Sequence, residues 1–140
     1  MKKKLILDID TDLDFELIGI CSHLVDYRLV WDLNKILDFH FERIENYCVY
    51  TKNGAIVTEH STYQFIDEEN KTSFFLVKNK NDGQFLIPEK SSIDYFLFLY
   101  ENYIVNVEEL VQKIKKASSV LGVYPFEPSE IASAKNIELI

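Results

Sequence analysis

The chain has 140 residues, of which 47% are hydrophobic and 27% are charged, with four Gly and three Pro. Such a composition excludes disordered and collagen-like sequences, and a domain of this length buries roughly two thirds of its surface on folding, so one compact domain is expected over residues 1 to 140. The net charge of −8 at pH 7 disfavours nucleic acids and anionic membranes as partners, because binding to either needs a local basic patch.

The start of the chain resembles neither a membrane span nor a secretion signal. No apolar run approaches the ~20 residues that cross a bilayer. Asp8 and Asp10 interrupt the short apolar stretch that follows the three lysines at residues 2 to 4. Cys21 and Cys48 are too few for a disulfide framework and are interpreted as buried thiols in a reducing compartment. A soluble, cytoplasmic protein is predicted.

The first expected element covers residues 4 to 20, where apolar residues alternate with acidic ones, as in LDIDTDLDFEL. The acidic side chains are Asp8, Asp10, Asp12, Asp14 and Glu16. A period of two is typical of a strand with one buried and one solvated face. We therefore expect a long strand, bent near Thr11 or Gly19, whose acidic row faces water and discourages edge-to-edge pairing.

Two chemical alternatives remain for this acidic row. LILDIDTDL resembles the first motif of the haloacid-dehalogenase phosphatases, and the resemblance would make Asp8 the nucleophile and Asp10 the acid/base. Asp12 stands where that family has Thr, and the rest of the chain does not predict the parallel sheet of that family. The other alternative is a weak Mg²⁺ or Ca²⁺ site at Asp8, Asp10 and Asp12. Neighbouring members of this row lie ~6.6 Å apart along a strand, so they can share an ion only if the strand bends.

A helix is expected over residues 22 to 38, with Ser22 as its N-cap. Tyr27 and Trp31 stand one turn apart on this helix. Its apolar side is formed by Leu24, Leu29, Leu33, Ile36 and Leu37.

Hairpin signals divide the middle of the chain. The dipeptides at residues 53–54 (Asn-Gly) and 82–83 (Asp-Gly) favour type I′ turns, and residues 68 to 71 make a third turn. Strands are accordingly expected over residues 43 to 51, 56 to 66, 72 to 79, 84 to 88 and 93 to 101. Short turns between successive strands predict an antiparallel meander.

A second helix is expected over residues 106 to 121. Asn106 and Glu109 form a capping-box pattern, lysines crowd the last turns, and Gly122 suits the position after the helix. The remaining tail is expected to close irregularly over the core. The predicted fold is α+β, with an antiparallel meander sheet of five to seven strands and two principal helices packed on one face.

The segment IPEKSSIDYF, residues 87 to 96, resembles the signature of the IPExxVDY family, a family of small proteins of Bacteroidota. The matching residues are Ile87, Pro88, Glu89, Asp94 and Tyr95, and Ile93 replaces the usual Val. The stretch LDIDTDLDFELIGICSHLVDYRLVWDLN is similar to the N-terminal half of that family, so the resemblance covers most of the chain. It implies no activity.

The same segment has a structural and a functional interpretation. Pro88 ends the preceding strand because it lacks a backbone donor, and Asp94 is expected to accept hydrogen bonds from the backbone of residues 90 to 92. Alternatively, Glu89, Asp94 and Tyr95 form a polar contact site for a partner. The spacing of Pro and Asp favours the structural interpretation, since it explains the motif without a ligand.

The function predicted from the sequence is that of a non-enzymatic binding or adaptor protein, with a protein partner or a second copy of the chain. The partner would meet an aromatic surface or add a strand to an open sheet edge. The candidate contact residues are Tyr27, Trp31, Glu89, Asp94 and Tyr95. The alternative is a metal-dependent hydrolase or phosphatase using Asp8, Asp10 and Asp12. No cofactor, nucleic-acid partner or membrane contact is predicted.

Overall fold

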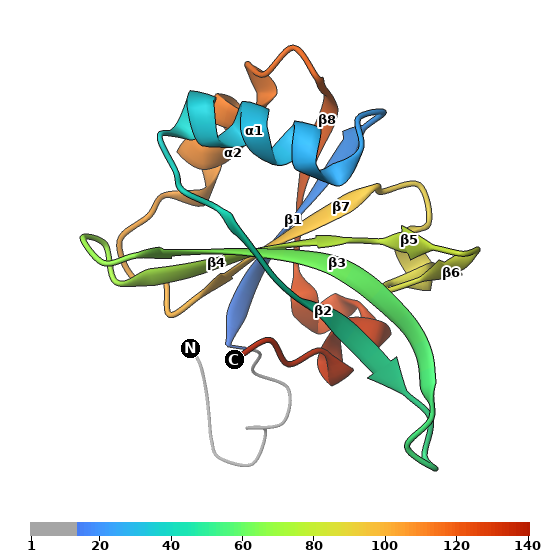
Figure 1. Cartoon of the computed structure of the whole chain (residues 1–140). Coiled ribbons are helices and arrows are strands. Elements are labelled where there is room, and N and C mark those ends of the chain that lie inside the picture. Colours follow the sequence, from blue (N-terminus) through green and yellow to red (C-terminus); the bar gives the residue numbers. More distant parts are fainter. Residues whose placement is uncertain (1–13) are drawn as a thin grey trace.

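The computed structural model describes residues 14 to 140 and shows an α+β fold (Figure 1). Its strands and helices are, in chain order, β1 (Phe15–Ser22), α1 (Asp26–Leu37), β2 (Glu42–Tyr50), β3 (Ile56–Asp67), β4 (Thr72–Lys78), β5 (Lys80–Asn81), β6 (Gln84–Phe85), β7 (Tyr95–Tyr100), α2 (Val107–Lys115) and β8 (Val120–Phe126). Three short 3₁₀-helices cover Pro88–Lys90, Pro128–Glu130 and Ala132–Asn136.

The main sheet has six antiparallel strands in the order β2-β3-β4-β7-β1-β8, and β5 pairs with β6 in a separate small ribbon. The strands β2, β3 and β4 follow one another as a meander. The first strand, β1, lies between β7 and β8, which come much later in the chain. For example, Ile18 of β1 is paired with Leu97 on one side and Pro125 on the other. The predicted α+β class, the antiparallel sheet and the two helices are confirmed.

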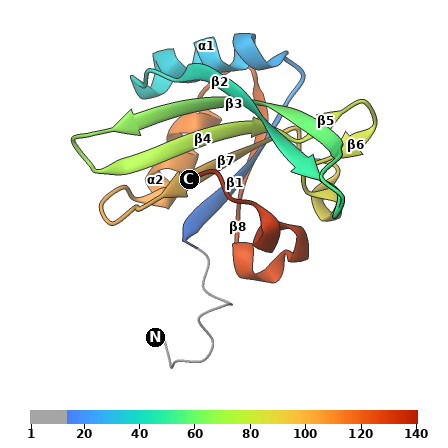
Figure 2. The same ribbon diagram turned by 60° about the horizontal axis from the view of Figure 1, so that its bottom comes forward.

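Both faces of the sheet are covered (Figures 1 and 2). Successive side chains of a strand point to opposite faces, and all six residues of β7 are buried. One face packs on the helices, with a core that includes Ile18, Leu76, Leu97, Leu29, Leu33, Leu110 and Ile114. The other face packs on the C-terminal segment, with a core that includes Leu17, Phe75, Phe96, Phe98, Ile131, Ala134 and Ile137.

This arrangement corrects the prediction for the first strand. The alternation of buried and exposed residues holds at Phe15, Glu16 and Leu17, but the next three residues of β1 are all buried. The strand is central rather than half-solvated, because α1 and α2 cover one of its faces and the C-terminal segment covers the other. The part of the predicted strand before residue 14 lies outside the described residues.

The first helix begins four residues later than predicted. Ser22 does not cap it, because Ser22 is the last residue of β1, where its Oγ donates to Ser119 O (2.8 Å) and accepts from Leu24 N (3.2 Å). The N-cap of α1 is instead Val25, which gives no side-chain hydrogen bond. At the start of α1, Asp26 Oδ1 accepts from Tyr27 N at 2.8 Å, and the preceding Leu24 O accepts from the Tyr95 hydroxyl at 2.6 Å.

The second helix ends at Lys115 rather than at residue 121. Its start is as predicted, since Asn106 Oδ1 accepts from Glu109 N at 3.0 Å. After the helix the chain forms β8, which the sequence did not predict and which pairs with β1. The physical reason is tertiary: the second edge of β1 needs backbone partners, and β8 supplies them. Leu121, the last residue of the predicted helix, is 62% exposed in β8.

Two turn predictions have different outcomes. Asp82 and Gly83 have φ of 50° and 80°, as a type I′ turn requires. In the β2–β3 hairpin only Gly54 has a positive φ (86°), so that turn is of another type. The strand predicted over residues 84 to 88 ends at Phe85, because a 3₁₀-helix starts at Pro88.

Candidate functional site

The outer face of α1 carries two exposed aromatic side chains. Tyr27 and Trp31, one turn apart, are 65% and 60% exposed. The ammonium of Lys35, a further turn along, lies 4.4 Å from the centroid of the Trp31 ring, which is a cation–π contact. The buried residues of the opposite face are Leu29, Val30, Leu33 and Leu37. We call Tyr27, Trp31 and Lys35 the α1 stripe.

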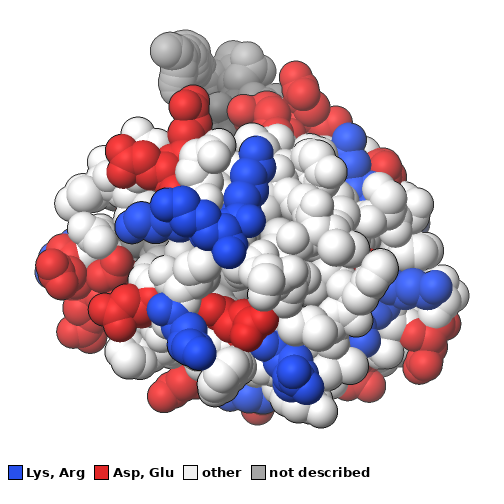
Figure 3. All heavy atoms as spheres, turned by 90° about the horizontal axis from the view of Figure 1, so that it is seen from above, with Lys and Arg blue, Asp and Glu red and all other residues white. Residues whose placement is uncertain are grey.

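A groove lies beside this stripe, between the C-terminal half of α1 and the residues that directly follow α2. Its volume is about 360 Å³. Its lining residues, which define the helix groove, are Asp32, Lys35, Ile36, Lys116, Ala117 and Ser118. Lys35 belongs to both features, so the stripe and the groove are continuous. Several Lys and Arg side chains lie near one another on this helical side of the molecule (Figure 3).

The segment IPEKSSIDYF is held by a residue that the sequence analysis did not single out. Asn79 is fully buried, and its Nδ2 donates to Lys90 O (3.1 Å) and Ile93 O (2.8 Å). Its Oδ1 accepts from Ile87 N at 2.9 Å. Nothing in the local sequence around Asn79 signals these contacts, because they join the end of β4 to a loop eight to fourteen positions further along.

Asp94 stabilises the fold, but not through the contact predicted for it. Its Oδ2 accepts from Ser22 N at 2.9 Å, at the end of β1, rather than from the backbone of residues 90 to 92. The Asp94 backbone N–H also donates to Ile20 O (3.1 Å). The carboxylate therefore fastens β1 to the start of β7.

Tyr95 does not belong to the exposed aromatic surface for which it was predicted. The side chain is only 3% exposed, and its hydroxyl donates to Leu24 O at 2.6 Å. Burial, together with the nearby Asp26 and Asp94 carboxylates, raises the pKa of Tyr95 well above its ordinary value. Tyr95 therefore contacts the segment before α1 and, because it is buried, is inaccessible to a partner.

Glu89 lies in the same motif but contacts a different part of the protein. It is exposed, and its two oxygens accept from Ser133 N (2.9 Å) and Ser133 Oγ (2.6 Å). These hydrogen bonds lower the pKa of Glu89. Glu89 thus joins the motif to the C-terminal 3₁₀-helix Ala132–Asn136.

The five predicted contact residues accordingly occupy separate places, and the structure brings together only Tyr27 and Trp31 on one surface. Lys35, which contacts Trp31, and Lys116, which lines the helix groove with Lys35, were not predicted from the sequence. The spacing of Lys35 from Trp31 along the helix is a usable signal, whereas the approach of Lys116 depends on the packing of α2 against α1.

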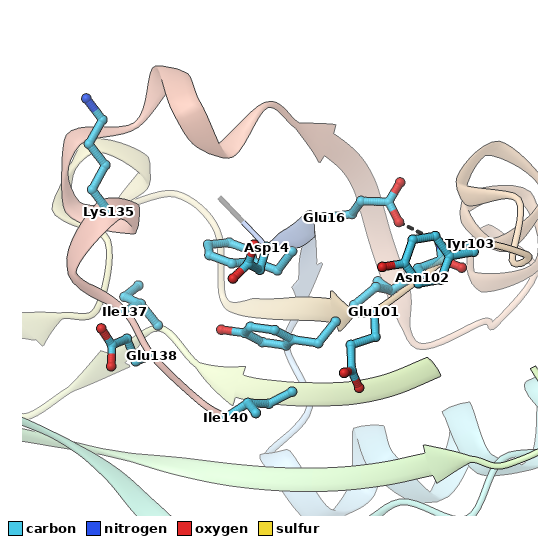
Figure 4. Close-up of a pocket in the computed structure, with 12 residues that line it drawn as sticks. Asp14, Glu16, Glu101, Asn102, Tyr103, Lys135, Ile137, Glu138 and Ile140 are labelled. Atoms are coloured by element: carbon cyan, nitrogen blue, oxygen red, sulfur yellow. Dashed lines mark hydrogen bonds between the residues drawn. The ribbon is translucent and has the colours of Figure 1, made fainter. Parts of the chain in front are cut away.

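A second cavity lies elsewhere, at the start of β1, and has a volume of about 880 Å³ (Figure 4). Its charged lining residues are Asp14, Glu16, Glu101, Glu138 and Lys135. Tyr100 also lines it, and burial raises the pKa of Tyr100 to about 12. Figure 4 shows Lys135 pointing away from the acidic side chains. This cavity is strongly acidic.

The metal hypothesis concerns Asp8, Asp10 and Asp12, which lie outside the described residues and stay a prediction. Within residues 14 to 140, no group of three or more His, Cys, Asp or Glu side chains is placed to hold a metal ion. Thermal shift with Mg²⁺, Mn²⁺ and Ca²⁺ would test the three carboxylates directly.

The remaining reactive side chains have structural surroundings. His60 is fully buried, with Nδ1 2.9 Å from Lys78 O and Nε2 2.8 Å from Thr58 Oγ1. Burial lowers the pKa of His60, and a carbonyl can only accept, so the neutral ring carries its proton on Nδ1. Cys21 and Cys48 are free thiols and half-buried, not fully buried as predicted.

Comparison of the chain with protein-family models and with curated protein sequences gives no match. Among the helices of residues 14 to 140, none combines the length and the apolar character that a membrane crossing requires.

Proposed function

We propose that this chain is a non-enzymatic binding protein that docks a protein partner on the outer face of α1. The observation that carries the proposal is the exposure of Trp31 and Tyr27 one turn apart on a helix whose other face is buried. Trp and Tyr supply a large share of the binding energy of protein interfaces when a partner covers them. A short helix with two such side chains in water presents a suitable anchor.

The surroundings of the motif residues support a binding role over a catalytic one. The Asp94 carboxylate is engaged by Ser22, the Glu89 carboxylate by Ser133, and the Tyr95 hydroxyl by a backbone carbonyl. Each of these groups therefore has a role in holding the fold. We further propose membership of the IPExxVDY family on the match within residues 87 to 96, and this adds no activity.

The test is affinity capture from a lysate of the source organism with three single variants. Trp31→Ala and Tyr27→Ala remove the two anchors, and Tyr103→Ala is a matched control because Tyr103 is 90% exposed in the loop between β7 and α2. Substitutions at such exposed positions change the free energy of unfolding by less than about 0.5 kcal/mol, so all three proteins stay folded.

The wild type and Tyr103→Ala should capture a partner that Trp31→Ala and Tyr27→Ala lose. Equal capture by all four proteins would contradict the proposal. Analytical ultracentrifugation of the wild type and Trp31→Ala separates a second copy of the chain from a different partner, because only self-association changes the mass of the purified protein.

A further inference from the structure

We infer that the partner segment is acidic, with its carboxylates at Lys35 and Lys116 and an apolar side chain between them in the helix groove. The inference rests on the proposed function, because it assigns the chemistry of the partner at the same face of α1. Three observations support it: the charged residues that line the helix groove, the apolar residues at its base, and its position beside Trp31.

The helix groove differs in sign from the rest of the protein. The chain carries a net charge of −8, whereas the groove is lined by two lysines, Lys35 and Lys116, against one carboxylate, Asp32. Charges more than about 8 Å away are largely screened at physiological salt, so the charges that line the groove influence the binding of a segment more than the net charge of the chain does.

The floor of the groove suits an apolar side chain. Ala117 is buried at 6% exposure, and Ile36 packs partly against the core. A volume of about 360 Å³ is at the small end of ligand pockets, which span roughly 300 to 1,000 Å³, and fits one or two side chains rather than a whole element. A segment that alternates acidic and apolar residues would meet both the cations and the floor.

Lys35 is already positioned for this contact. Its ammonium stacks on the Trp31 ring at 4.4 Å, so the cation is held at the boundary between the α1 stripe and the groove. A carboxylate that binds Lys35 would place the neighbouring apolar side chain against Trp31 or over Ala117. Holding a contact group in place before binding lowers the entropy lost on association.

Aromatic and basic side chains together also suit single-stranded nucleic acid, whose bases stack on aromatic rings. The groove offers only two lysines for a phosphate backbone, and the chain as a whole carries a net charge of −8. Since affinity for nucleic acid rises with the number of phosphates neutralised, the acidic protein segment is favoured.

The experiment uses Trp31 as its own reporter, because it is the only tryptophan in the chain. The full chain is titrated with three synthetic peptides of equal length that alternate Leu or Phe with Glu, Gln or Lys. The Glu peptide should change Trp31 emission saturably, with a dissociation constant about tenfold lower than that of the Gln peptide, and the Lys peptide should bind no better than the Gln peptide. The response to the Glu peptide should weaken as salt is added.

Charge reversal identifies the groove as the site. Lys35→Glu/Lys116→Glu should weaken the Glu peptide by about tenfold or more and should strengthen the Lys peptide. The matched control, Lys52→Glu/Lys135→Glu, changes the net charge by the same amount at exposed positions outside the groove and should leave the affinity within about twofold. Dissociation constants rather than emission amplitudes are compared, because Lys35 touches the reporter ring.

Three results would overturn the inference: equal affinity for the Glu and Gln peptides, unchanged affinity of the groove variant for the Glu peptide, or tighter binding of an oligothymidylate than of the Glu peptide. If a captured partner needs Trp31 but binds the groove variant normally, the acidic segment is wrong and the docking face stands. If the partner needs neither Trp31 nor Tyr27, the proposed function itself is wrong.

Discussion

Asn79 provides the sharpest test of how the motif segment is held. The change Asn79→Ala removes three hydrogen bonds at once and leaves Ile87 N–H and Ile93 O without their partner, whereas Lys90 O still accepts from Ile93 N at 3.1 Å. Asn79 is fully buried, so no solvent replaces the lost amide without a rearrangement of the loop. The backbone bonds of Asn79, to Asp94 O (2.9 Å) and from Leu86 N (2.7 Å), are kept.

The expected cost follows from the groups left behind. A buried donor or acceptor without a partner costs about 1 to 3 kcal/mol. The bonds to Ile87 and Ile93 are buried and should cost this much, whereas the bond to Lys90 is partly buried and costs less. The two buried groups together cost about 2 to 6 kcal/mol, a large part of the ~5 to 15 kcal/mol that stabilises a typical domain. Asn79→Asp should cost at least as much at neutral pH, because a carboxylate would face two carbonyl oxygens.

The measurement is urea unfolding followed by circular dichroism, with the free energy of unfolding compared between the wild type, Asn79→Ala and Asn53→Ala. Asn53 is exposed in the β2–β3 turn and serves as the matched control, expected to change the free energy by less than about 0.5 kcal/mol. A loss below about 1 kcal/mol in Asn79→Ala would refute the reasoning, because it would mean that Ile87 N–H and Ile93 O find other partners.

Three further predictions concern groups with assigned contacts. Asp94→Ala leaves the partly buried Ser22 N–H without its acceptor and should lower the free energy of unfolding by about 1 to 2 kcal/mol. Asp94→Asn keeps an acceptor and should cost less. Equal melting temperatures of the wild type and both variants would contradict this. Hydrogen bonds from Ser133 lower the pKa of Glu89 below 4.5, so Glu89→Gln should lower the free energy of unfolding by less than about 1 kcal/mol near neutral pH. The difference between the two proteins should vanish as the pH falls through that lowered pKa. An undiminished difference in acid would count against the contact. Burial lowers the pKa of His60 below 6.5 in the folded protein, so His60 is protonated more readily in the unfolded chain and the free energy of unfolding falls as the pH drops below about 6.5. An NMR titration of the His60 ring with a midpoint at or above 6.5 would refute this.

Local signals in the sequence account for much of the fold. The Asp82–Gly83 turn and the Asn106 cap are encoded by neighbouring residues, and the structure places both as predicted. The errors arise where distant segments meet. β8 contains Gly122 and Pro125, which obscure the alternation of a strand, and only its pairing with β1 shows why it is extended.

The candidate surface was predictable only in part. Tyr27 and Trp31 share a face because of their spacing along one helix, and that inference needs no tertiary information. Tyr95 looked equally available, yet it lies under the chain that leads into α1. Lys116 joins Lys35 only through the packing of α2 on α1, which residue spacing along the chain does not encode.

The central place of β1 has a consequence for biosynthesis. Ile18 leaves the ribosome well before its strand partners, Leu97 and Pro125. The segments β2, β3 and β4 are able to pair in the order in which they emerge, while β1 must wait with apolar side chains on both sides. A nascent or truncated chain that stops before residue 120 would leave one side of β1 with free backbone groups, and such an edge recruits strands from other chains. The pairing of β8 with β1 therefore closes an edge that would otherwise be open to strands from other chains.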